Sequence, residues 1–111
     1  MRKELSQRLG RGLELDLLFK SGRRLANALF QCTVRANDLA HNRFVFVVAR
    51  AVDKRATQRN RLRRRCREYM RTHIPYTLVG RDIAVVVKKN AIAASRKEFY
   101  DSLGEILRRI P

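Results

Sequence analysis

The chain has 111 residues, which suits one domain with one core and is too short for two full domains. Its 26 Lys and Arg residues against ten Asp and Glu give a formal net charge of +16, and such a field favours a polyanionic partner. The longest apolar run, Phe44 to Ala49, is far too short to span a membrane, and the N-terminal segment lacks the apolar stretch of a signal peptide. We therefore expect one cytoplasmic domain over residues 1–111, structured over 8–110, with 1–7 as a flexible leader.

The N-terminal half predicts one helix followed by a hairpin of two strands. Leucines at helical spacing predict a short helix over 12–20, which Gly22 ends. Apolar and polar residues alternate from Leu25 to Arg35, which predicts a single strand with one wet face. After a polar turn, the β-branched and aromatic run from Arg43 to Arg50 predicts its partner. The inward face of the first strand is expected to carry Phe30, Cys32 and Val34.

The C-terminal half predicts a helix, a buried strand and a second helix. The helix over 56–72 has an apolar stripe on an otherwise basic surface, made by Leu62, Cys66, Tyr69 and Met70. An apolar run within 82–88 suits a strand buried on both sides, and Ser95 with Glu98 forms a capping box at the start of the last helix. The order α, β, β, α, β, α, with room for one short extra strand, predicts an α+β fold in which about three helices pack on one small mixed sheet.

Few side chains in this sequence suit catalysis. The two cysteines and the two histidines are isolated and match no metal or redox motif, and we interpret Cys32 and Cys66 as small core residues. Asp53 and Glu68 are the only acids between Arg50 and Arg71, where basic neighbours are expected to lower the pKa of each carboxyl. We therefore predict no catalytic residue and no metal site made by this chain alone.

Ten of the 22 residues from Arg50 to Arg71 are basic, a density typical of nucleic-acid binding. On a helical wheel one face spans about 140° of arc and carries Arg59, Asn60, Arg63, Arg64, Arg67 and Arg71. A guanidinium donates two parallel hydrogen bonds to a phosphate, and Glu68 is spaced to pair with Arg64. A merely solvated face is the weaker interpretation, because so many like charges repel one another unless an anion is bound. A membrane-surface role is weaker still, since the apolar stripe has a core-like pattern.

The string Arg59-Asn60-Arg61-Leu62-Arg63-Arg64-Arg65-Cys66-Arg67-Glu68 resembles the R-N-x-x-[KR]-R-x-x-R-E signature of the bacterial ribonuclease P protein subunit. Leu18–Gly22 is similar to the end of that family's first helix, and Gly80–Val86 to its G-x-D-I-x-V-V strand. With Phe99, Leu103 and Leu107 similar to its last helix, the resemblance covers residues 8–110 in order.

The resemblance implies an α/β sandwich with an unusual left-handed βαβ crossover. It also implies that the protein assists a catalytic RNA. This RNA would remove the 5′ leader of precursor tRNA, with Mg2+ bound mainly by the RNA. The implied partners are ribonuclease P RNA and precursor tRNA, with no obligate protein partner. Two alternatives stay open: a noncatalytic ribosomal or RNA-chaperone-like protein, and a nuclease that cuts by itself.

The resemblance also assigns residues to two RNA surfaces. The motif helix would face the RNA subunit through Arg59, Asn60, Arg63, Arg64 and Arg67. A second, less secure set of contacts comprises Arg50, Lys54, Arg55 and Arg71. The 5′ leader would cross a cleft between the first helix and the sheet, lined by Leu15, Phe19, Asn27, Gln31 and Thr33. Leu15 replaces an aromatic residue usual in the family, Phe19 suits either core packing or leader contact, and the loop Ala49–Ala56 departs from the family pattern.

Overall fold

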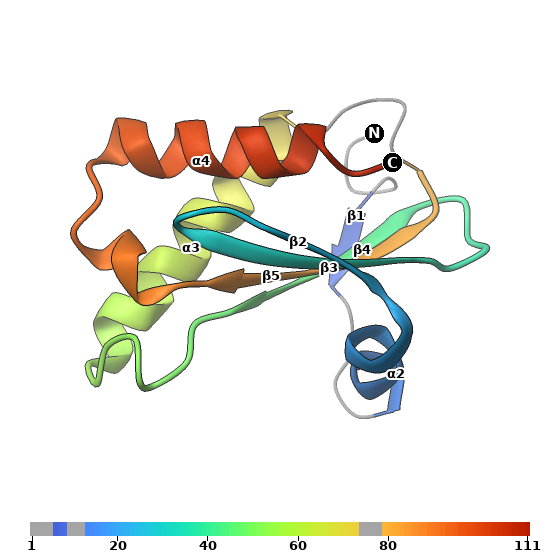
Figure 1. Cartoon of the computed structure of the whole chain (residues 1–111), viewed down its shortest axis with the longest axis horizontal. Coiled ribbons are helices and arrows are strands. Elements are labelled where there is room, and N and C mark those ends of the chain that lie inside the picture. Colours follow the sequence, from blue (N-terminus) through green and yellow to red (C-terminus); the bar gives the residue numbers. More distant parts are fainter. Residues whose placement is uncertain (1–5, 9–12, 74–78) are drawn as a thin grey trace.

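The computed structural model describes residues 6–8, 13–73 and 79–111. Its elements in chain order are β1 (Ser6–Arg8), α2 (Leu13–Ser21), β2 (Arg23–Ala26), β3 (Phe30–Ala36), β4 (Asn42–Val47), α3 (Ala56–His73), β5 (Arg81–Val87), the short 3-10 helix η1 (Lys89–Ile92) and α4 (Arg96–Arg108). Helices α3 and α4 lie on one side of a central sheet and α2 on the other (Figure 1). Within these described ranges, no helix is long and apolar enough to cross a membrane.

The sheet has five strands in the order β1-β4-β5-β3-β2. The pairs β1–β4 and β4–β5 are parallel, whereas β3 is antiparallel to both β5 and β2. Because β4 and β5 are parallel neighbours, the chain crosses from one to the other through α3. This mixed sheet with its helices confirms the predicted α+β class, and the left hand of the crossover stays an expectation from the family resemblance.

Three features of the N-terminal half differ from the sequence prediction. The hairpin predicted between the strand over 25–35 and the strand over 43–50 is wrong, because β5 lies between β3 and β4 in the sheet and pairs with both. The single strand predicted from Leu25 to Arg35 is wrong, because the chain turns after β2 and returns as β3. Asn27 makes this turn: its side-chain Oδ1 accepts hydrogen bonds from the backbone N–H groups of Leu29 and Phe30, at 3.2 and 2.9 Å. Apolar and polar residues alternate through this turn without interruption, so periodicity alone does not reveal the turn. Strand β1 lies partly in the segment expected to be a leader, and its three residues are too few to show a period.

The main core lies between the sheet and the α3–α4 layer. The predicted inward face of β3 is confirmed, because Phe30, Cys32 and Val34 are all buried there. Phe30 packs edge-on against Phe99 of α4, with ring centroids 5.0 Å apart. Burial raises the pKa of both thiols, Cys32 and Cys66, to about 12, so each stays protonated and acts as a small core residue, as predicted.

The opposite side of the sheet carries a smaller core beneath α2. Leu18 and Ala84 are buried there, with Leu15, Phe19 and Val45 packed against them. Gly22 ends α2 by donating its N–H to the Leu18 carbonyl at 2.8 Å, and a Cβ at this position would lie 2.6 Å from Cγ2 of Thr33. Glycine is therefore required here by close approach, and it holds the end of α2 directly against β3.

Candidate nucleic-acid interface

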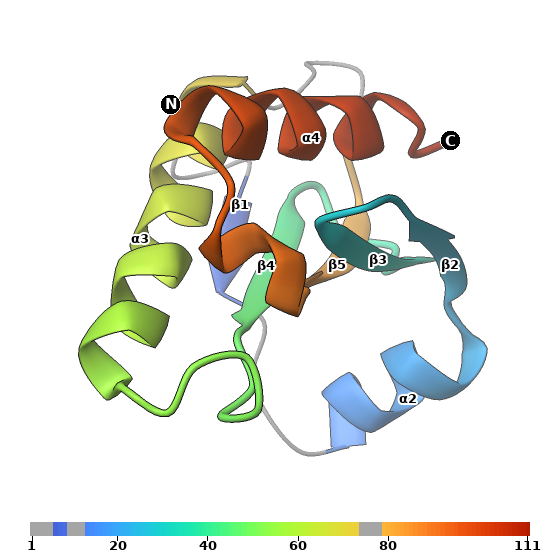
Figure 2. The same cartoon turned by 60° about the vertical axis from the view of Figure 1, so that its left-hand side comes forward.

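Helix α3 points one side to the core and the other to solvent. Leu62, Cys66 and Met70 recur at i, i+4 and i+8 and are buried against the sheet and α4, whereas Arg64 and Arg67 are exposed. Figure 2 shows α3 along one flank of the molecule, with α2 at the far side of the sheet. Burial of the apolar stripe thus orients the basic residues outward, as the helical wheel predicts.

The loop before α3 is held by its own charged residues. Asp53 accepts hydrogen bonds from the backbone N–H of Arg55 at 2.8 Å and from the Arg55 guanidinium at 2.9 Å. These bonds and the positive charge of Arg55 lower the pKa of Asp53 to about 2, as its basic neighbours led us to expect. Arg59 donates from Nη1 to the carbonyl oxygens of Asp53 and Lys54, at 2.9 and 2.8 Å. Arg59, expected to face RNA, is half-buried and supports this loop.

The outer surface of α3 carries a set of side chains that we call the arginine row, namely Asn60, Arg63, Arg64, Arg67 and Arg71. Arg63 donates to the Asn60 side-chain oxygen at 3.2 Å. In the part of the chain that the structure describes, no hydrogen bond or ion pair engages the guanidiniums of Arg64, Arg67 and Arg71. Their donors are therefore free for an anionic ligand.

The pair expected between Arg64 and Glu68 is absent from the ion pairs of the described residues. An acid that follows its basic partner by four residues is in the weaker orientation on a helix. The helical wheel places two other arginines of this helix, Arg61 and Arg65, outside the arginine row. Arg61 is exposed, and Arg65 is half-buried with its guanidinium 5.8 Å from the centroid of the Phe99 ring.

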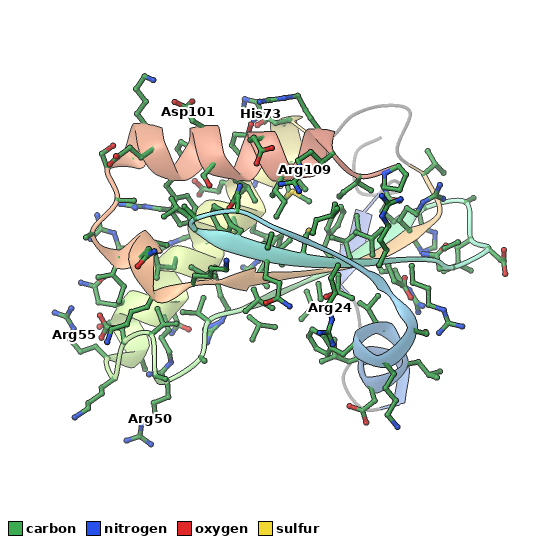
Figure 3. All side chains as sticks on the ribbon, in the orientation of Figure 1. Arg24, Arg50, Arg55, His73, Asp101 and Arg109 are labelled. Atoms are coloured by element: carbon green, nitrogen blue, oxygen red, sulfur yellow. The ribbon has the colours of Figure 1, made fainter. Side chains whose placement is uncertain are left out.

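The loop basic residues extend the charged surface beyond the start of α3. Arg50, Lys54 and Arg55 are all exposed, and Figure 3 shows Arg50 and Arg55 pointing away from the body of the protein at this end. The second set of predicted contacts therefore splits, with three members in the loop and Arg71 near the end of α3. Arg55 is already bound to Asp53, whereas Arg50 and Lys54 present their charge to solvent.

The second predicted surface lies on the α2 side of the sheet. Leu15, Phe19 and Gln31 are half-buried, and Phe19 packs on the small core while part of its surface stays accessible. Thr33 is fully buried beneath α2 against Gly22, and its hydroxyl has no hydrogen-bond partner among the described residues. We call the accessible part the α2 face. Its members are Leu15, Phe19 and Gln31, together with Arg24 of β2, whose side chain donates to the Phe19 carbonyl.

Asn27 does not belong to this surface, which corrects the sequence prediction. Its side-chain Nδ2 donates to the backbone carbonyl of Ser102 at 2.9 Å and to Glu105 at 3.0 Å, both on α4. Its carboxamide therefore ties the β2–β3 turn to α4, on the opposite side of the sheet. The family resemblance had placed Asn27 with Gln31, and in one continuous strand the two would share a face. The turn between β2 and β3 directs Asn27 to α4 instead.

Arg24 is a member of the α2 face that sequence reasoning missed. It pairs with Thr33 across the hairpin, which puts both side chains on the same side of the sheet, and its Nη2 donates to the Phe19 carbonyl at 3.4 Å. Figure 3 shows Arg24 reaching toward α2. Only the β2–β3 register identifies it, and the hairpin that sets this register was absent from the prediction.

No group of three or more His, Cys, Asp and Glu side chains gathers within the described ranges. Several acids serve as structural partners, such as Asp82, which binds Arg43 at 2.6 Å and Asn37 at 2.9 Å. The family resemblance implies Mg2+ bound mainly by the RNA, and these described side chains do not form a site that fits the ion.

A family model described as Ribonuclease P matches residues 4–111. The chain belongs to the ribonuclease P protein family. Among its curated relatives, the ribonuclease P protein component of Xylella fastidiosa is 40% identical over 100 residues, covering 87% of this chain and 70% of that protein. The component of Vibrio cholerae is 38% identical over 76 residues, 68% of this chain but only 64% of that relative's length.

The fold also matches a solved ribonuclease P protein. The protein from Thermotoga maritima superposes with a TM-score of 0.85 at 30% identity, over 95% of this chain and 98% of that chain. The arginine row and the α2 face both lie within the matched length, so this ribonuclease P family member carries them on the family's own fold.

Proposed function

We propose that this chain is the protein subunit of ribonuclease P, and that it binds the catalytic RNA and the 5′ leader of precursor tRNA in the cytoplasm to promote maturation of the tRNA 5′ end. The observation that carries the proposal is the arginine row. Arg64, Arg67 and Arg71 are exposed and have no protein partner among the described residues, on the helix whose sequence resembles the family signature. Free guanidiniums in a row suit closely spaced phosphates.

The arginine row acts through charge. Each phosphate that a guanidinium neutralises releases condensed counterions, so affinity is high at low salt and falls steeply as salt rises. The formal net charge of +16 extends this attraction over the whole surface. This term explains binding of the folded RNA subunit without requiring a base sequence.

The α2 face suits a single strand, as the 5′ leader is. Phe19 offers part of an aromatic ring, Gln31 offers an amide that both donates and accepts, and Arg24 places a positive charge beside them. Unpaired bases stack on aromatic rings and hydrogen-bond through their edges. Contacts of this kind would hold the leader in place and so position the cleavage site relative to the catalytic RNA.

Magnesium is proposed as the cofactor of the assembled enzyme, bound mainly by the RNA, where it would supply the activated water. The roles proposed for this chain are binding and positioning, with no obligate protein partner. Asp53 supports this assignment, because its carboxylate binds Arg55 and holds the loop before α3.

The test is precursor-tRNA cleavage with magnesium at near-physiological salt, with three reactions: protein alone, a bacterial ribonuclease P RNA alone, and both together. We expect cleavage to rise only in the mixture. Cleavage by the protein alone would identify a nuclease that cuts by itself. Binding without stimulation would favour a general ribosomal or chaperone-like RNA-binding protein.

A further inference from the structure

A groove of about 630 Å³ lies between the last turns of α3 and the outer side of α4. It shares no residue with the α2 face, and it shares Arg71 with the arginine row. Its lining includes three aromatic rings and three arginines, namely Tyr69, His73, Tyr100, Arg71, Arg96 and Arg108. His73 and Asp101 mark it in Figure 3, at the edge of the molecule where α3 meets α4. None of the lining residues that the structure describes is aliphatic, so this described part of the groove offers little to a lipid tail or an apolar peptide side chain.

The three rings form one continuous stack. The Tyr69 ring lies parallel to Tyr100 with centroids 5.4 Å apart, and His73 lies parallel to Tyr69 at 4.1 Å. Gly104 of α4 makes room for this arrangement, because a Cβ there would collide with the Tyr69 hydroxyl. His73 is exposed at the end of the stack, so the outer side of its imidazole is accessible for one more flat ring.

The charges around the stack favour an anion. Arg96 lies over the Tyr100 ring at 5.5 Å, and no hydrogen bond or ion pair among the described residues engages Arg71 or Arg108. Two acids also line the groove, but Asp101 is bound to Lys97 at 2.8 Å. An aromatic end next to free guanidiniums matches a nucleotide, which has a flat base beside a phosphate.

We propose that this groove binds an unpaired purine nucleotide of an RNA strand, with the base stacked on His73 and the phosphate bound by Arg71 and Arg108. This proposal rests on the proposed function, because it needs an RNA ligand. Arg71 belongs both to the arginine row and to the lining of the groove. An RNA strand bound along the arginine row would therefore reach the groove. Glu68, the other acid of the lining, can accept a hydrogen bond from the amino group of the base.

The proposal is tested with a local fluorescent reporter. The chain has no tryptophan, so His73→Trp introduces a single one at the end of the stack, and His41→Trp introduces the matched control in a distant loop. The probe is an eight-residue oligoadenylate RNA at about 0.15 M salt, compared with an abasic strand of equal length and charge. We expect the emission of His73→Trp to be quenched by oligoadenylate only, and that of His41→Trp to be unchanged by either strand.

Affinity supplies a second measurement. His73→Ala should weaken oligoadenylate binding by about fivefold, the lower range for loss of one stacked base, whereas His73→Phe and His41→Ala should stay close to the unmodified protein. Equal quenching by the abasic strand, equal quenching of both tryptophan variants, or unchanged affinity of His73→Ala would overturn the proposal. Stimulation of precursor-tRNA cleavage by the unmodified protein, measured in parallel, shows whether the groove alone or the proposed function has failed.

Discussion

The arginine row of α3 and the α2 face of the sheet are built in different ways. The arginine row comes from one helix, and its exposed members make few contacts with the rest of the protein. The α2 face combines residues of α2, β2 and β3, and these side chains are mostly half-buried. The first surface therefore depends on charge and on one helix, whereas the second depends on how a helix docks on a sheet.

This difference indicates how each surface responds to change. Charge attraction acts at a distance and is reduced by salt, and the loss of one arginine leaves the neighbouring arginines in place. Stacking and hydrogen bonding act only at contact, so a small shift of α2 alters the whole α2 face. Five variants, one of them a double substitution, test these two surfaces and the elements that support them.

The largest effect is expected at the junction that holds α2. Gly22→Ala places a Cβ against the Leu18 carbonyl and Thr33, and overpacking of this kind reduces the free energy of unfolding by about 1–3 kcal/mol. Urea-induced unfolding measures it. Ala40→Ser, which adds one atom at an exposed loop position, is the control, and equal stability of the two variants would show that α2 does not depend on this contact.

The arginine row is tested by Arg64→Ala combined with Arg67→Ala. Binding of the RNA subunit should weaken, and the slope of log affinity against log salt should become shallower by roughly one unit per lost phosphate contact. Filter binding at several salt concentrations measures both quantities. Arg23→Ala with Arg35→Ala removes the same charge from exposed strand positions; an identical slope change there would show that only net charge matters.

For the α2 face, Phe19→Leu keeps an apolar side chain for packing but removes the aromatic ring. We expect affinity for precursor tRNA to fall by about fivefold, as for the loss of one stacked base, and affinity for mature tRNA to stay the same. The comparison is made with the RNA subunit bound. Leu17→Ala, at an exposed position of the same helix, should change neither affinity, and an equal loss for both tRNAs would remove Phe19 from the leader site.

A substitution of Thr33 tests whether this residue on the α2 side of the sheet contributes to stability or to leader binding. Its hydroxyl is buried without a partner in the described part of the chain, and an unsatisfied polar group of this kind costs about 1–3 kcal/mol. Thr33→Val should therefore increase the free energy of unfolding, by about 1 kcal/mol, and leave leader affinity unchanged. A destabilised variant would mean that the hydroxyl has a partner in solution.

The smallest effect is expected at the loop before α3. The pKa of Asp53 is about 2 in the folded protein, below the value of about 3.9 typical of an unfolded chain. Its contribution to stability is therefore present above about pH 4 and is lost as the pH falls toward 2. Asp53→Asn should be less stable than the unmodified protein at pH 7, with the difference vanishing in that range. Urea-induced unfolding of both proteins at pH 7 and at pH 2 measures the difference, and an equal difference at the two pH values would contradict the prediction.

Much of the fold follows from local patterns. The apolar stripe of α3, the capping box of α4 and the buried run of β5 each lie within one short segment, so spacing alone locates these elements to within a residue or two. Ser95 accepts from the Glu98 N–H at 3.1 Å, as the capping box predicts. The outward direction of Arg64 and Arg67 follows in the same way.

The errors occurred where a side chain's role is set by a distant partner. Asn27 was assigned to the leader surface but binds α4, 75 residues further along the chain. Arg24 joins the α2 face only through its pairing with β3. Arg59 supports the nearby loop carbonyls of Asp53 and Lys54, and its contact with RNA stays a prediction. Residue type alone does not tell whether a polar group is used inside the protein or left for a ligand.

The sequence by itself determined the charge, the main helices, the inward face of β3 and the family, because each rests on composition or on short-range spacing. Only the tertiary structure decided the order of the five strands, the membership of the α2 face and the aromatic groove between α3 and α4. Those features join residues far apart in the chain, and their positions depend on packing between elements, which a periodic pattern does not encode.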